Sequence, residues 1–152
     1  LSSAASDVYK RQFLAYKTER YNIKGKDVVA GNCKYYLNDL SFKNFLYPGF
    51  AYGVGYLLEN AVYLELRRLG YIVYTGSFRD KEVDFVAMKD DRVIYLQATY
   101  MLETAQTMER EYAPLLTIGD NYEKYVVSMD EVQFPSNEGV RHIQAWNLKE
   151  IL

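Results

Sequence analysis

Between residues 54 and 69 the apolar positions repeat with the period of a helix that buries one face. They are Val54, Leu57, Leu58, Ala61, Val62 and Leu69, which follows the i, i+3, i+4 spacing of an amphipathic helix. Gly70 comes directly after the last of them and suits the end of a helix, where a left-handed backbone is common. The pattern predicts a helix that carries Glu59.

The period then changes to that of strands. Residues 71–75, 82–88 and 93–99 are β-branched, aromatic or alternating, and the polar loop 89–92 joins the last two as a hairpin. A helix is predicted over 104–115, with Met108, Tyr112 and Leu115 on one stripe. Strands at 122–128 and 140–145 and a short closing helix at 148–152 complete the chain. The order α-β-β-β-α-β predicts an α/β (α+β) fold in which helices flank a mixed β-sheet.

The N-terminal third is more polar. It predicts strands near 18–23 and 34–40 and a helical turn at 41–46, after which Pro48-Gly49 breaks the chain. We therefore place a boundary there, with residues 13–50 as the remnant of a preceding region and 51–152 as the main domain. Residues 1–12 (LSSAASDVYKRQ) resemble a sequencing-adapter artefact, and we expect that the natural chain was cut upstream.

Composition limits the function further. The 152 residues carry a formal net charge of −2, which does not favour strong nucleic-acid binding but leaves room for a local basic stripe. The candidate phosphate contacts are Lys24, Lys26, Arg67 and Arg68, but a solvated edge for the two lysines and a helix end for the two arginines are the simpler explanations. One cysteine, Cys33, indicates a reducing, cytoplasmic setting, and no apolar run is long enough for a membrane span.

Some chemistries are excluded by the residues present. No glycine-rich phosphate loop occurs, so we expect no nucleotide-binding residues in this chain. Cys33 and His142 are the sole cysteine and histidine, which excludes a zinc finger. We expect Cys33 to be a small buried residue and His142 a surface or packing residue.

The hairpin brings four polar side chains together. If the loop is 89–92, Met88 faces Val93, Asp84 faces Gln97 and Glu82 faces Thr99. Because side chains alternate along a strand, these four would share one face, and Val83 and Phe85 would point the other way. A solvated sheet face explains the pattern as well as a site does.

These residues carry a resemblance. The element order, the helix Glu, EVDF at 82–85 and YLQATY at 95–100 resemble the PD-(D/E)XK restriction-endonuclease-like superfamily. More narrowly, the chain is similar to the domain of unknown function that follows the P-loop module in many prokaryotic AAA-type ATPases. The matching pieces are RYNIKGK (20–26), KYYLNDL (34–40), LENAVYLELRRLGY (58–71), KEVDF (81–85), IYLQATY (94–100), TMEREYAPLL (107–116) and DNYEKYVV (120–127).

The resemblance implies a missing N-terminal ATPase domain, which would bind ATP and be the partner of this domain in the same chain. Residues 13–50 would then belong to a winged-helix-like or linker segment. It also implies a site for a divalent metal, Mg²⁺ above all, formed by a helix Glu, a strand Asp and a following D/E-x-K. Glu59 and Asp84 match the first two, whereas Gln97 and Thr99 stand in place of the carboxylate and the lysine.

This replacement predicts a degenerate catalytic site at Glu59, Asp84, Gln97 and Thr99. Gln97 removes a negative charge from a hard-cation site, and Thr99 supplies no cation for developing charge. Glu82 could complete a metal set with Glu59 and Asp84, and Lys81 or Lys124 could supply the cation. We expect no catalysis from this fragment. Three functions stay open: an inactive nuclease-fold module that recognises DNA or a protein, an active Mg²⁺-dependent nuclease with a rearranged site, and a purely structural assembly module.

Overall fold

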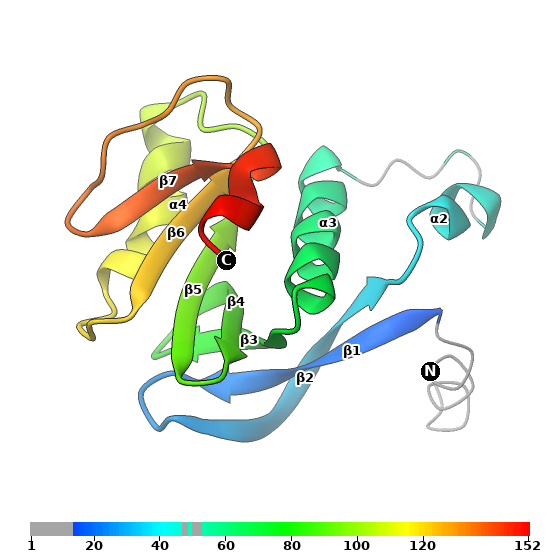
Figure 1. Ribbon diagram of the computed structural model, residues 1–152, viewed down its shortest axis with the longest axis horizontal. Coiled ribbons are helices and arrows are strands. Elements are labelled where there is room, and N and C mark those ends of the chain that lie inside the picture. Colours follow the sequence, from blue (N-terminus) through cyan, green and yellow to red (C-terminus); the bar gives the residue numbers. More distant parts are fainter. Residues whose placement is uncertain (1–13, 47–48, 50–52) are drawn as a thin grey trace.

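The computed structural model describes residues 14–46, 49 and 53–152 (Figure 1). The predictions for residues 1–12 and for the break at Pro48 lie outside this part. The strands are β1 (Ala15–Asn22), β2 (Asp27–Leu37), β3 (Ile72–Phe78), β4 (Lys81–Lys89), β5 (Arg92–Ala98), β6 (Glu123–Ser128) and β7 (Val140–Gln144). The helices are α2 (Ser41–Leu46), α3 (Val54–Arg68), α4 (Ala105–Leu116) and the 3-10 helix η1 (Ala145–Glu150).

All of these strands join one mixed sheet in the order β2-β1-β3-β4-β5-β6-β7. Three neighbouring pairs are antiparallel, namely β1 with β2, β3 with β4 and β4 with β5. The pairs β1 with β3, β5 with β6 and β6 with β7 are parallel. The order α3-β3-β4-β5-α4-β6 confirms the predicted fold class, a mixed sheet flanked by helices.

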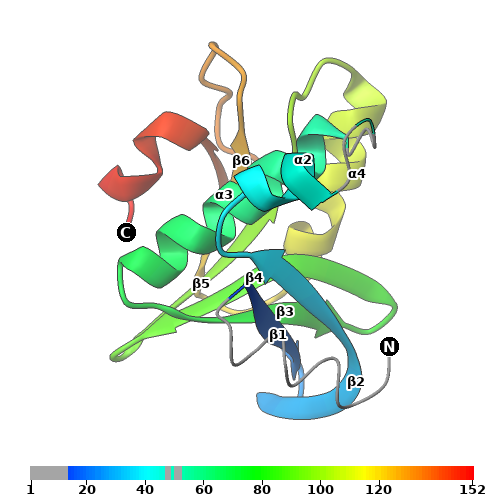
Figure 2. The same cartoon turned by 90° about the vertical axis from the view of Figure 1, so that its right-hand side faces the viewer.

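The sheet has an apolar core on each face. On one face α3 and η1 pack over Val73, Phe85, Ala87 and Leu96. On the other face α4 packs over Val83, Val86, Tyr95 and Val126. Figures 1 and 2 show α3 and α4 on opposite sides of the central strands.

Helix α3 begins at Val54 as predicted and ends at Arg68, and Gly70 after it has a φ of +88°. Its buried side chains are Leu58, Asn60, Val62, Tyr63 and Leu66. The prediction was wrong for Val54 and Ala61, which are exposed. The helical spacing is compatible with more than one buried stripe. The packing of α3 against the rest of the fold decides which stripe is buried, and Asn60 is buried because it contacts Leu37 at the end of β2.

Strands β1 and β2, which the sequence analysis assigned to a separate N-terminal remnant, are not a separate unit in this structure. β1 and β2 extend the same sheet, and α3 packs against β2. The rings of Tyr36 on β2 and Tyr63 on α3 stack with centroids 4.2 Å apart. Asn60 donates to the carbonyl of Leu37 at 2.9 Å and accepts from its N–H at 2.8 Å. The boundary expected near residue 50 therefore does not divide the fold.

Two strands are longer than the sequence pattern indicated. β2 starts at Asp27, and β3, which was predicted to end at Thr75, continues through Gly76. A side chain at Gly76 would put its Cβ 2.8 Å from Cγ2 of Val86. Glycine is present here because neighbouring side chains cover the strand closely, and not because the chain turns.

Helix α4 matches its prediction within one residue at either end. The side chain of Thr104 accepts from the N–H of Thr107 at 3.1 Å and caps the helix. Tyr112 and Leu115 are buried, as the predicted stripe required. None of the helices in the described part of the chain has the length and apolar character needed to cross a bilayer.

Candidate functional site

A β-bulge in β4 decides where the candidate carboxylates lie. Tyr74 pairs with Val86 and Gly76 pairs with Val83, so that Thr75 alone stands opposite both Asp84 and Phe85. An extra residue of this kind interrupts the alternation of side chains. Val83 consequently packs on the α4 face and Phe85 on the α3 face. Asp84 lies on the α3 face as well, within reach of residues from α3 and β2.

The ammonium group of Lys34 forms the centre of this site. Its Nζ lies 3.0 Å from Oε1 of Glu59, 3.0 Å from Oε1 of Glu82 and 3.2 Å from Oδ1 of Asp84. These are the three residues that the sequence suggested as metal ligands. We call Lys34, Glu59, Glu82 and Asp84 the lysine-carboxylate cluster.

Further hydrogen bonds fix the carboxylates of the cluster. The hydroxyl of Tyr36 donates to Oε1 of Glu59 at 2.7 Å. The N–H of Ala98 donates to Oδ2 of Asp84 at 3.0 Å. Arg20 approaches Oε2 of Glu82 at 3.4 Å. Each carboxylate thus has a second donor, and that donor holds it in place around Lys34.

The cluster holds more negative than positive charge, and the pKa values reflect this. Burial and the neighbouring Glu59 carboxylate raise the pKa of Asp84 to about 6, against the opposing effects of Lys34 and the Ala98 N–H. Burial by itself would lower the pKa of Lys34, but the charges of Asp84 and Glu59 and hydrogen bonds from Lys34 outweigh it and raise this pKa. Lys34 therefore stays protonated, and the excess negative charge instead makes Asp84 easier to protonate.

Gln97 and Thr99 do not join the cluster. The Gln97 side chain is turned toward α4, where its Nε2 donates to Oε2 of Glu111 at 3.2 Å. Its Oε1 accepts from the backbone N–H of Asp84 at 3.3 Å. Thr99 follows the last residue of β5, and its backbone N–H donates to the carbonyl oxygen of Val127. The prediction that all four residues share one face was wrong, because the bulge moves Asp84 to the opposite face from Gln97.

The hairpin register itself was predicted correctly. Met88 faces Val93, and the pairing continues to Phe85 opposite Leu96. Beyond that point the bulge begins and the regular ladder stops. The length of the loop gives the register of the hairpin, whereas the bulge depends on the pairing of β4 with β3, which lies outside the hairpin.

Lys34 and Tyr36 are the site residues that the sequence analysis missed. They were assigned to a separate N-terminal remnant and so were not considered as neighbours of Glu59. The proposed substitutes lie elsewhere, since Lys124 donates to Asp120 and to the carbonyl of Tyr122, and Lys81 lies beside α4. The sequence did contain one signal for them, since a lysine and a tyrosine two residues apart on one strand point to the same face of the sheet.

The cluster as it stands does not fit a metal ion. Carboxylate oxygens bind Mg²⁺ at about 2.0–2.1 Å, whereas these oxygens lie about 3 Å from Nζ of Lys34. Across residues 14–46, 49 and 53–152, no three or more carboxylates, histidines or cysteines are grouped closely enough to hold a metal ion. A metal would have to displace Lys34 and draw the carboxylates inward.

The candidate nucleic-acid contacts do not form one surface. Lys26, in the turn after β1, lies with Nζ 5.8 Å from the ring centroid of Tyr122, whose ring packs against Tyr95 on the α4 face. Lys24 lies in the same turn. Arg67 lies over the ring of Tyr16 on the α3 face, and Arg68 pairs with Glu65 at 2.6 Å. The two pairs therefore stand on opposite sides of the sheet.

A separate polar network is buried beyond the end of β6. The N–H of Phe134 donates to Nδ1 of His142, so Nε2 carries the proton and faces Oγ of Ser128 at 2.8 Å. Ser128 in turn donates to Oδ2 of Asp130 at 2.7 Å. Ser128 is fully buried and contacts Asp130 directly, so this network serves to hold the loop after β6 and does not form a nucleophilic site.

His142 gives the network a pH dependence. Burial lowers the pKa of His142, against the raising effect of Asp130. Because this folded-state pKa lies below the unfolded value of about 6.5, the unfolded chain binds more protons, and stability falls as the pH drops through that region. We expect the urea midpoint to fall between pH 7.5 and 5.5 more in the native protein than in His142→Gln. Equal shifts in both proteins would contradict this assignment.

No protein family matches the chain, and no solved structure matches it. A protein of Haemophilus influenzae described only as an uncharacterized protein is 34% identical over 122 residues, which is 80% of this chain. The chain spans 30% of the length of that relative.

Proposed function

We propose that this domain is a catalytically inactive nuclease-fold module and the C-terminal accessory domain of a cytoplasmic, prokaryotic AAA-type ATPase. In that setting it recognises nucleic acid or a partner protein. The observation that carries the proposal is the ammonium of Lys34, held within 3.2 Å of all three candidate metal ligands. A tethered cation at that point competes with a metal ion for the same carboxylates.

The chemistry of the neighbouring residues supports the same proposal. Gln97 contributes no negative charge and is bonded to Glu111, and no lysine stands at position 99. Losing a catalytic group typically lowers a rate by ~10²–10⁴-fold. The attachment to an ATPase rests on the resemblance of the sequence motifs. It is also consistent with a relative in which most of the length lies outside the matched region.

Metal titration and a cleavage assay test this proposal together. We expect that calorimetric titration of Mg²⁺ and Mn²⁺ into the chain gives no specific binding, and that labelled single- and double-stranded DNA stays intact. The same DNA followed by fluorescence anisotropy separates the remaining roles, because binding without cleavage favours nucleic-acid recognition. No binding favours a protein partner or a structural role.

Two variants make the result specific. Asp84→Ala removes a cluster carboxylate, and Asp80→Ala removes an exposed carboxylate in the turn before β4. Cleavage that persists in Asp80→Ala and disappears in Asp84→Ala would overturn the proposal. It would establish an active nuclease with a rearranged site, in which a metal displaces Lys34.

A further inference from the structure

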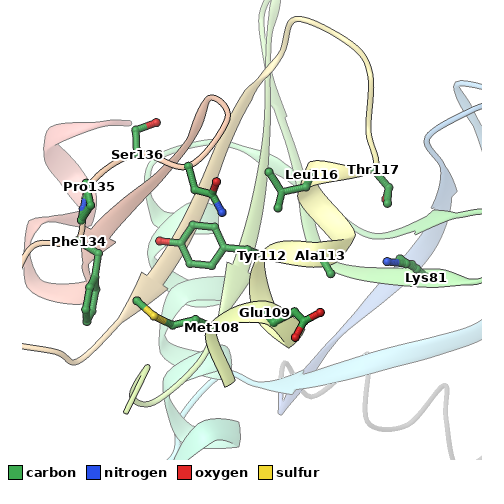
Figure 3. A pocket seen from close by; sticks show the side chains of 11 residues that line it. Lys81, Met108, Glu109, Tyr112, Ala113, Leu116, Thr117, Phe134, Pro135 and Ser136 are labelled. Carbon is green, nitrogen blue, oxygen red and sulfur yellow. The ribbon is translucent and has the colours of Figure 1, made fainter. Parts of the chain in front are cut away.

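A groove of about 650 Å³ lies between α4 and the loop that follows β6 (Figure 3). Its lining is mainly apolar and comes from Met108, Tyr112, Ala113, Leu116, Phe134 and Pro135. The volume falls in the range of ~300–1,000 Å³ that is common for small-molecule sites, which are also mostly apolar with a few placed polar groups. The groove lies on the opposite face of the sheet from the lysine-carboxylate cluster.

The hydroxyl of Tyr112 is the first polar group in this groove. Tyr112 is only 4% exposed, and its hydroxyl has no hydrogen-bond partner among the described residues. Figure 3 shows its ring reaching from α4 toward the loop that carries Phe134 and Pro135. A buried hydroxyl without a partner is unfavourable, and phenylalanine would fill the same space without that cost. The hydroxyl is thus a buried donor without a partner in a residue that lines the groove.

Lys81 is the second polar group. It lines the groove from the start of β4, and Figure 3 shows its ammonium directed toward α4. Within the described part of the chain no carboxylate pairs with it. Glu109 also lies on the rim, but its carboxylate points away from Tyr112 in the same view. The groove therefore combines an apolar surface with an unpaired cation at its edge.

We propose that this groove binds a small amphipathic anion with an aromatic or branched apolar body. The body packs against Met108, Leu116 and Phe134, and the Tyr112 hydroxyl donates to an acceptor on the ligand. The anionic group, a carboxylate or a sulfonate, pairs with Lys81. This site does not depend on the nuclease-fold proposal, since it uses none of the residues of the lysine-carboxylate cluster.

A pair of fluorescent probes with the same ring skeleton tests the proposal. 8-Anilinonaphthalene-1-sulfonate carries a sulfonate, and N-phenyl-1-naphthylamine is its uncharged counterpart. We expect saturable binding of both to the native protein, with the anionic probe the tighter. Lys81→Gln is expected to weaken the anionic probe on the order of tenfold and to leave the neutral probe unchanged, whereas Glu109→Gln is expected to tighten the anionic probe.

Filling the groove provides the matched control. Ala113→Trp places a large side chain in the groove and is expected to abolish binding of both probes. Ala30→Trp places the same side chain at an exposed position of β2 and is expected to leave both unchanged, with circular dichroism confirming that each variant is folded. Tyr112→Phe is expected to weaken the anionic probe several-fold. Binding that Ala113→Trp does not reduce, or a Lys81→Gln loss shared equally by both probes, would overturn the proposal.

Discussion

Replacing Lys34 by methionine is expected to destabilise the folded protein by about 2–4 kcal/mol at pH 7. The substitution keeps most of the side-chain volume but leaves Glu59, Glu82 and Asp84 without the cation that they share. Asp84 is buried, and a buried charge without a partner costs more than the loss of an ion pair on the surface. Urea denaturation at pH 7 measures the loss directly.

The deficit is expected to shrink as the pH falls toward 5. The folded-state pKa of Asp84, about 6, lies above the unfolded value of about 3.9. The folded protein therefore binds the proton more readily, and the Asp84 contribution to stability rises as the pH falls through this interval. Removing Lys34 raises the pKa of Asp84 further, so protonation relieves the variant more than the native protein.

Lys17→Met is the matched control for this prediction. Lys17 lies 3.9 Å from Glu19 and both side chains reach solvent, so the change is expected to stay within ~0.5 kcal/mol. If Lys34→Met were as stable as Lys17→Met at pH 7, Lys34 would not be neutralising the carboxylates in solution. The central argument for an inactive site would then lose its basis.

Replacing Asp130 by alanine is the other substitution with a large expected effect, about 3 kcal/mol of lost stability. Oδ2 of Asp130 accepts from the N–H of Leu102 at 2.8 Å and from the hydroxyl of Ser128 at 2.7 Å. Both donors are buried, and each buried donor left without an acceptor costs about 1–3 kcal/mol. Thermal unfolding followed by circular dichroism gives the size of the effect.

Asp130→Asn separates the hydrogen bonds from the charge. The amide keeps an acceptor oxygen, so we expect about half the loss seen with alanine. Glu131→Ala, at the exposed neighbouring position, is expected to change stability by less than ~0.5 kcal/mol. A loss of similar size in Glu131→Ala and Asp130→Ala would show that the loop tolerates neither change, and that the buried network is not the cause.

The network also links stability to the proposed ligand groove. Asp130 anchors the start of the loop, and His142 holds the N–H of Phe134 at 3.2 Å. Phe134 lines the groove opposite α4. The position of the groove wall therefore depends on buried polar contacts, which place an otherwise irregular segment at one location on the sheet.

Most of the element order could be predicted from local pattern. The helical period of residues 54–69, the stripe formed by Met108, Tyr112 and Leu115, and the hairpin loop at 89–92 act over short distances along the chain. Those signals gave α3, α4 and the register that joins Met88 to Val93. The choice between the two apolar stripes of α3 was not local, because it depends on the contact between Asn60 and Leu37.

The candidate site shows the same division more strongly. Glu59, Glu82 and Asp84 could be selected from the sequence, and the structure brings these three together. Gln97 could not be placed correctly, since strict alternation puts it beside Asp84 and the bulge opposite Thr75 does not. Lys34 was not placed at the site, because its neighbours there lie 25 and 50 residues further along the chain and the spacing of Lys34 and Tyr36 does not by itself indicate those neighbours.

The sequence by itself determined the order and approximate positions of the helices and strands, the hairpin register and the absence of charge at position 97. Each depends on residue type and on spacing within one or two elements. The tertiary structure alone decided that β1 and β2 belong to the sheet and that a bulge turns Asp84 toward α3. As a result, the cation among the carboxylates is Lys34. Which residues meet at the site depends on the pairing of strands that are far apart in the sequence and on the bulge where β4 pairs with β3.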